Sequence, residues 1–218
     1  MALVQSLAAQ VLAVLRDVGY DNWTLNSINA AIYEGELSVV NFEPEATATL
    51  ATHSCTQGVE QTIANDGHRL LSVIHNVSPS GSYGRGVRRK AVEDLDALTP
   101  EWRGAVTSDV IREYAIDERL PKMFFTNPPA SDTAKLRISY SKTPTAYGTV
   151  GASTKTTVGD TYAPAVVEWA LYRLFGHDVE NSVNISRSQQ HYQVFFNLLG
   201  LKVQNEKIQS PLNPEHKR

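Results

Sequence analysis

Apolar residues recur at helical spacing near both ends of the chain and at strand spacing between them. The helical pattern covers residues 1–44 and 160–200, and the strand pattern covers residues 45–142. Two helical segments that flank a strand-rich segment can share one core if the ends of the chain fold against each other. The sequence therefore predicts an α+β fold, in which a bundle of N- and C-terminal helices carries an inserted antiparallel β sandwich or barrel.

The N-terminal segment contains two predicted helices. Apolar residues follow steps of three and four over residues 3–18, and Gly19 is a natural C-terminal stop, so the first helix is expected to have about four turns. A second apolar stripe covers residues 25–40, and Asp21 or Thr24 can cap the helix that carries it. Both helices are amphipathic and need a partner to pack against.

Short segments separated by turn residues fill the middle of the chain and predict six or seven strands. Residues 69–77 are mostly apolar, as expected of a central strand. Residues 108–117 alternate, which places Val110 and Tyr114 on one face and Ile111 on the other. Regular turns between short strands favour a sandwich or a small barrel.

Residues 143–159 are rich in Thr, Gly and Ser and carry no helical stripe. Loops of this length inside compact domains are usually functional or mobile. Two interpretations remain open. The segment is either a crossover from the sheet to the bundle or a projecting loop that contacts a partner.

Two further helices are predicted after this loop, over residues 160–176 and 179–199, with Gly200 as the C-terminal stop of the second. Three aromatic residues widen the apolar face of the first of these helices beyond what one partner helix would cover. They are Trp169, Tyr172 and Phe175. We expect them either to pack in the core or to contact another subunit.

The last segment, residues 201–218, is polar, contains two prolines and has few apolar residues. These apolar residues are Leu201, Val203, Ile208 and Leu212. A tail of this composition is expected to be mobile on its own, and it is the obvious candidate for an arm that becomes ordered on a partner.

Composition excludes some classes of protein. The formal charge of -3 argues against a dedicated duplex-binding domain, which would carry a strong basic excess. No apolar run reaches the roughly 18 residues that span a bilayer, so no membrane partner is expected. The N-terminal segment is interrupted by Gln10, Arg16 and Asp17, which is unlike a secretory signal, and synthesis in the cytoplasm is expected.

No catalytic fingerprint appears in the sequence. It contains neither a phosphate-binding G-x-x-x-x-G-K-[ST] loop, nor an H-E-x-x-H pair, nor a G-x-S-x-G elbow. Cys55 is the only cysteine, which excludes an intramolecular disulfide, and a buried apolar role is expected for it. The acidic pairs at 93–94 and 117–118 are typical of solvated turns. We therefore predict no catalytic, cofactor-binding or metal-binding residue.

One basic cluster stands out, and it consists of Arg85, Arg88, Arg89 and Lys90. Charged residues commonly protect an edge strand from unwanted pairing, so a solvated edge is the expected place for this cluster. A contact with a phosphate group or an acidic partner is the alternative.

Several segments taken together resemble the head-to-tail adaptor proteins of short-tailed bacteriophages, including the group called tail tubular protein A. The resemblance rests on their order and spacing. In chain order they are LNSINAAIYEGELSVVNFEPEA, DGHRLLSVIHNV, LDALTPEWR, YAIDERLPKMFFTNPPA, DTYAPAVVEWALYRLFGHD and SQQHYQVFFNLLG.

The resemblance implies a structural protein of the virion tail or neck that forms a dodecameric ring. Its partners would be further copies of itself, the portal protein, the tail nozzle and a tail fibre or spike, while genomic DNA passes through the lumen without specific binding. The C-terminal segment would reach the portal, which assigns portal docking to the apolar residues of the arm. Two other hypotheses compete with this one: a virion-associated cell-wall hydrolase, motivated by the scattered acidic and histidine residues, and a carbohydrate-binding module.

Overall fold

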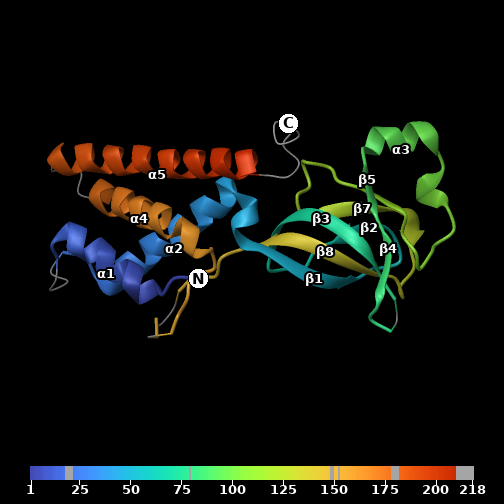
Figure 1. The fold of residues 1–218 in the computed structure, drawn as a ribbon, viewed down its shortest axis with the longest axis horizontal. Helices are drawn as coiled ribbons and strands as arrows, with labels where there is room; N and C mark the ends of the chain where they lie inside the picture. The colour runs from blue at the N-terminus through green and yellow to red at the C-terminus, as the bar shows by residue number, and fades with distance from the viewer. Residues whose placement is uncertain (18–21, 79, 148–149, 152, 178–181, 210–218) are drawn as a thin grey trace. The chain divides into compact units, whose positions relative to one another are not determined.

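The chain divides into two compact units, shown in Figure 1. The computed structural model describes residues 1–209 apart from 18–21, 79, 148–149, 152 and 178–181, and it describes side chains as far as residue 200. A helical unit combines Met1–Ala46 with Pro144–Arg218, and a β unit consists of Thr47–Thr143. The predicted α+β class is confirmed.

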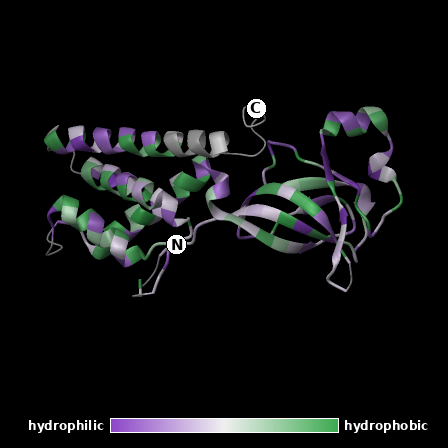
Figure 2. Cartoon of the chain, viewed as in Figure 1, coloured by the Kyte–Doolittle hydropathy of each residue, from purple (hydrophilic) through white to green (hydrophobic). Residues whose placement is uncertain are grey.

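In the part of the chain that the structure describes, the helical unit is built on four α-helices: α1 (Val4–Leu15), α2 (Leu25–Phe42), α4 (Ala163–His177) and α5 (Ser182–Gln209). Helix α4 packs against both α2 and α5, and α1 packs against α2 and α4. Figure 2 shows apolar and polar residues interspersed along these helices. The apolar sides meet in one core that contains Leu7, Val11, Ile28, Ile32, Val166, Leu171 and Phe195.

The ends of the two N-terminal helices have local causes. Thr24 caps α2, because its Oγ1 accepts a hydrogen bond from the Ser27 backbone N–H at 3.2 Å. Helix α1 ends at Leu15, earlier than predicted, and Arg16 adopts a left-handed conformation with φ 57°. A left-handed residue reverses the chain direction after a helix, so a residue other than glycine provides the stop. Gly19 and Asp21 lie outside the described residues.

The last helix is longer than predicted. Helix α5 continues through Gly200 to Gln209, so the prediction that Gly200 ends it is wrong. A glycine in a helix interior costs about 1 kcal/mol relative to alanine, which is too little to end a helix with helix-forming residues on both sides. The backbone of Leu201, Val203 and Ile208 is therefore helical, whereas Leu212 lies outside the described residues.

The described part of the loop between residues 143 and 159 belongs to the helical unit from Pro144 onwards. Its residues 154–156 run beside the N-terminus. The Val4 N–H donates to the Thr154 carbonyl at 3.0 Å, and the Thr156 N–H donates to the Ala2 carbonyl at 2.9 Å. Val158 is fully buried in the helical core. This end of the loop is thus part of the packed unit.

The β unit contains two four-stranded sheets, with strand orders β1-β8-β3-β4 and β2-β7-β6-β5. The strands are β1 (Ala48–Ser54), β2 (Gly58–Thr62), β3 (Gly67–Val77), β4 (Tyr83–Gly86), β5 (Arg88–Lys90), β6 (Glu113–Ala115), β7 (Met123–Ala130) and β8 (Lys135–Lys142). All pairs are antiparallel except β5 with β6. Each sheet ends in two different edge strands, so the arrangement is an open sandwich and not a closed barrel.

Apolar side chains from both sheets fill the space between them, including Leu70, Ile111, Phe124 and Leu136. A short helix, α3 (Val92–Leu98), and Trp102 form a small second core with Ala115. Residues 83–86 form β4 against β3.

The predicted strand over residues 108–117 is largely wrong, because only Glu113–Ala115 pairs as β6. Val110 is exposed, while Ile111 and Tyr114 are both buried, so the expected alternation of faces fails. The buried side chain of Asn76 explains the difference. Its amide donates to the Ile111 carbonyl and accepts from the Ile111 N–H, both at 2.8 Å, and so replaces a strand partner at this position.

Candidate interaction surfaces

An aromatic cluster joins α4 to α5 in the helical unit. The ring of Trp169 lies 4.8 Å from that of Phe195, the ring of Tyr172 lies 4.9 Å from that of Tyr192, and Phe175 stacks on the imidazole of His191 at 5.5 Å. Phe175 is buried, whereas Trp169 and Tyr172 are half-buried. The three aromatic residues picked out in the sequence therefore all pack against the following helix.

Polar contacts flank this cluster and fix the register of the helices. The Glu168 carboxylate lies 2.7 Å from His191 Nδ1, and the Ser188 hydroxyl donates to the Tyr172 carbonyl at 2.8 Å. On the α2 side, Arg173 Nε lies 2.6 Å from a carboxylate oxygen of Glu34. These groups orient α4 against both neighbours, and nothing in their geometry suggests a reaction.

The carboxyl group of Glu36 holds the end of the loop against α2. Its Oε2 accepts from the Tyr147 hydroxyl at 2.5 Å, and its Oε1 accepts from the backbone N–H groups of Thr157 at 2.7 Å and Val158 at 3.3 Å. Glu36 is fully buried. Burial raises the pKa of this carboxyl group, and the three hydrogen bonds partly offset the increase. Glu36 was not among the residues picked out from the sequence.

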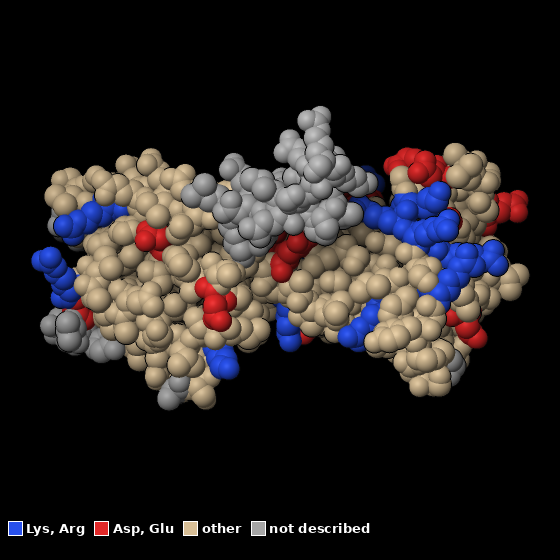
Figure 3. Space-filling model, viewed as in Figure 1, with Lys and Arg blue, Asp and Glu red and all other residues tan. Residues whose placement is uncertain are grey.

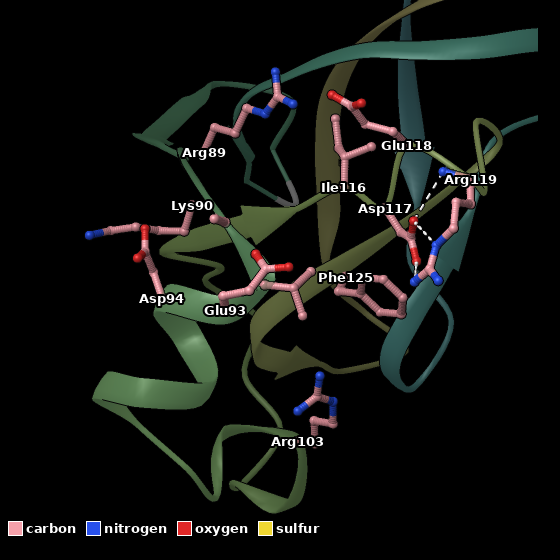
Figure 4. Close-up of a pocket in the computed structure, with 12 residues that line it drawn as sticks. Arg89, Lys90, Glu93, Asp94, Arg103, Ile116, Asp117, Glu118, Arg119 and Phe125 are labelled. Atoms are coloured by element: carbon pink, nitrogen blue, oxygen red, sulfur yellow. Dashed lines mark hydrogen bonds and ion pairs between the residues drawn. The ribbon is translucent and has the colours of Figure 1, made fainter.

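An open groove of about 1030 Å³ lies beside α3 in the β unit (Figure 4). Arg89 and Lys90 reach it from β5, Glu93 and Asp94 from α3, and the turn after β6 contributes further charged residues. That turn supplies Asp117, Glu118 and Arg119. Val92, Ile116 and Phe125 provide the apolar part of the lining.

The charges in this groove balance each other. Arg119 Nη2 lies 2.7 Å from Asp117 Oδ2, and hydrogen bonds from Arg119 lower the pKa of Asp117 to about 2. Asp117 therefore stays ionised at neutral pH and is unsuited to donate a proton. Arg103, which also lines the groove, pairs with Asp96. Figure 3 shows basic and acidic side chains intermixed on this side of the β unit, which favours a mixed-charge protein partner over nucleic acid.

The basic run identified in the sequence is split between two edge strands. Arg85 lies on β4, and Arg88, Arg89 and Lys90 make up β5, which is the edge of the second sheet. Arg85, Arg88 and Arg89 are exposed. The predicted edge position is confirmed.

Cys55 is buried in the core of the β unit, and burial raises the pKa of its thiol to about 11. A protonated, enclosed thiol is a poor nucleophile. Among the described residues, no three His, Cys, Asp or Glu side chains gather closely enough to hold a metal ion.

Within the described ranges, no helix is both long and apolar enough to cross a membrane.

No curated protein matches this sequence. Residues 3–215 match the family model described as SU10 adaptor protein, so the match covers both units and nearly the whole chain. It confirms the resemblance inferred from the sequence at the level of a phage adaptor family. The chain therefore belongs to the SU10 adaptor protein family, whose members are structural proteins of bacteriophage virions.

Proposed function

We propose that this protein is a non-enzymatic head-to-tail adaptor in the neck of a short-tailed phage. Twelve copies form a ring that binds the portal on one side and the tail nozzle on the other, with tail fibres or spikes as further neighbours. A ring needs two different, mutually complementary binding surfaces on each subunit, because its contacts are head-to-tail. The family and the two-unit architecture of the chain support this assignment.

The observation that carries the proposal is the length of α5. The contacts between aromatic side chains pair Phe175 with His191, Tyr172 with Tyr192 and Trp169 with Phe195. Helices α4 and α5 therefore run antiparallel. If this register continues, Ala163, the first residue of α4, lies opposite residue 201. The rest of α5, residues 202–209, continues for about 12 Å with no α4 residue opposite it. A helix that outruns its packing partner is suited to bind another protein.

We assign portal docking to this extension and to the residues that follow it. Its apolar anchors are Leu201, Val203, Ile208 and Leu212. The half-buried rings of Trp169 and Tyr172 are proposed to contact a neighbouring copy with their outer edges, in addition to packing against α5. Phe175 serves the core alone.

The charge of the chain fits a ring around DNA. A formal charge of -3 lacks the strong basic excess of proteins that hold a duplex, which supports passage of the genome through the lumen without specific binding. Among the described residues of the groove and the loop, no feature favours the hydrolase or the carbohydrate-binding hypothesis. Turnover of purified peptidoglycan, or saturable sugar binding, would support those alternatives.

Removing residues 201–218 tests the docking assignment. The core residue Leu199 and the whole α4 interface remain in the shortened chain. We expect its circular dichroism and its unfolding midpoint to stay close to those of the full chain, while binding to cognate portal in a sedimentation assay is lost.

A matched pair of substituted chains separates apolar anchoring from simple loss of length. One variant replaces Leu201, Val203, Ile208 and Leu212 by serine. The control replaces four polar tail residues by serine, namely Gln204, Asn205, Gln209 and Asn213. Only the first variant should lose portal binding. Normal portal binding by the truncated chain would refute the docking assignment.

A further inference from the structure

The edge of β1 is open for pairing. The Cys55 N–H, just after β1, donates to the Ala134 carbonyl at 2.9 Å, so this position faces β8. Backbone groups alternate along a strand, which turns the N–H and C=O groups of every second residue away from β8. The outward-facing residues are Ala48, Leu50, Thr52 and Ser54. Among the described residues, only β8 pairs with β1.

The other three sheet edges carry features that discourage pairing. Strand β5 consists of three basic residues, Arg88–Lys90. Strand β2 carries Glu60 and has a register shift after Gly58, and the four-residue β4 carries Arg85 and also pairs with a register shift. Charges, bulges and short length are the usual means by which proteins protect an edge from other chains.

Strand β1 lacks all of these features. It has seven residues, with the sequence ATLATHS, and pairs with β8 without a register shift. It contains no Lys, Arg, Asp, Glu or Pro. Leu50 points out of the sheet with 56% of its surface exposed. A regular, uncharged edge with an exposed leucine is suited to accept another strand.

We propose that β1 pairs antiparallel with β1 of a second copy, about a two-fold axis that passes close to Ala51. In this register Leu50 lies opposite Thr52 of the second copy, and Ala48 lies opposite Ser54. All four outward-facing residues then meet one another, and each opposed pair exchanges two backbone hydrogen bonds. The result is one continuous eight-stranded sheet across two β units.

The surrounding charges favour this orientation and this partner. Arg137 and Lys135 of β8 lie beside Thr52 and Ser54, at one end of β1. Antiparallel pairing brings that end against the other copy's Ala48 end, whose β8 neighbour is the uncharged Ser141 and where the charge of the following Lys142 is paired with Asp66 at 3.1 Å. Parallel pairing would place four cations at the same end. None of the opposed side chains carries a charge, so two copies meet without repulsion.

This contact differs from the one that builds the proposed ring. A two-fold contact uses the same surface on both copies and closes at two subunits, whereas a ring requires two different surfaces. The dimer therefore forms in the protein before it joins the ring. There it covers a strand edge that would otherwise promote aggregation. The inference stands independently of the portal assignment.

Charge-swapped variants of the full-length protein test the register. One variant carries Leu50→Lys with Thr52→Lys, and the other carries Leu50→Glu with Thr52→Glu. In the proposed dimer, each variant alone would place like charges opposite each other, and a mixture of the two would pair Lys with Glu. Ile74→Lys is the matched control, since this exposed apolar residue lies two strands away in the same sheet.

Sedimentation equilibrium from micromolar to near-millimolar protein gives the readout. We expect the wild type and Ile74→Lys to pass from monomer to dimer, both double variants to stay monomeric, and their equimolar mixture to recover the dimer. Unfolding midpoints check that the double variants are folded. A wild type that stays monomeric, a double variant that dimerises like the wild type, or a mixture that stays monomeric would overturn the proposal.

Discussion

Replacing Glu36 tests how the loop end is fixed to the helical unit. Alanine at this position removes the acceptor of three donors: the Tyr147 hydroxyl and the N–H groups of Thr157 and Val158. Glutamine keeps the shape of the side chain. Its carbonyl oxygen can accept from both backbone groups, and its amide can donate to the Tyr147 oxygen.

The magnitude follows from the number of donors left without a partner. Each buried, unsatisfied donor costs about 1–3 kcal/mol, so Glu36→Ala is expected to lower the free energy of unfolding of the helical unit by about 3 kcal/mol or more. Glu36→Gln keeps an acceptor for both backbone N–H groups and a hydrogen bond to the Tyr147 oxygen, leaves only the Tyr147 O–H without its acceptor, and removes a buried charge. Its effect at neutral pH is therefore expected to stay within about 1 kcal/mol.

The dependence on pH has a definite sign. Burial raises the pKa of Glu36 in the folded protein, so the folded state binds this proton more tightly than the unfolded state does. The contribution of Glu36 to stability is complete below its ordinary pKa and declines as the pH rises through the raised value. Glu36→Gln lacks this ionisable group. As the pH rises over that range, the free energy of unfolding of the wild type should therefore fall relative to that of the Gln variant.

Urea unfolding at several pH values, together with hydrogen exchange at Thr157 and Val158, measures these effects. Glu36→Ala should speed exchange at both amides, and Glu36→Gln should not. Equal stability of the Ala variant and the wild type would refute the hydrogen-bond argument. A Gln variant as unstable as the Ala variant would do the same.

Three further predictions concern packing and reactivity. A Cβ on Gly35 would lie 3.0 Å from the Val166 carbonyl oxygen. Gly35→Val should therefore destabilise the helical unit by about 1–3 kcal/mol, measured by urea unfolding. An unchanged unfolding midpoint would contradict the close approach of α2 and α4. Trp102 is fully buried and donates to Asp96 at 2.8 Å, so Trp102→Ala should cost the β unit about 3–5 kcal/mol by the same method, and a loss under about 1 kcal/mol would count against this packing. Cys55 should react with a chromogenic disulfide reagent far more slowly in the native protein than in denaturant, and equal rates would show that the thiol is accessible.

Hydrophobic periodicity predicted the fold class because it reports which side of each element is buried. The stripes of α2 and α4 and the apolar run of β3 were found on this basis, and Thr24 was among the capping residues proposed. Periodicity did not decide between sandwich and barrel, since closure depends on which strands become edges, and that is set by long-range pairing.

The errors arose where a distant group replaced a local rule. Asn76 lies 35 positions from Ile111 and supplies its backbone partners, so local alternation carried no information about that segment. Gly200 was given too much weight, because one glycine only weakens a helix.

Glu36 could have been found from the sequence. It continues the stripe of Ile28 and Ile32 at steps of four, and an acidic residue within an apolar stripe signals a buried carboxyl group with specific partners. The identity of those partners, more than 100 positions away, could not be predicted from the sequence.

Cryo-electron microscopy of the purified protein mixed with its cognate portal tests the central proposal most directly. We expect a closed ring of copies on one face of the portal, with residues 201–218 of each copy in contact with it. Particles that show bare portal at saturating protein, or a ring attached through the β unit with the C-terminal segment free, would contradict the account.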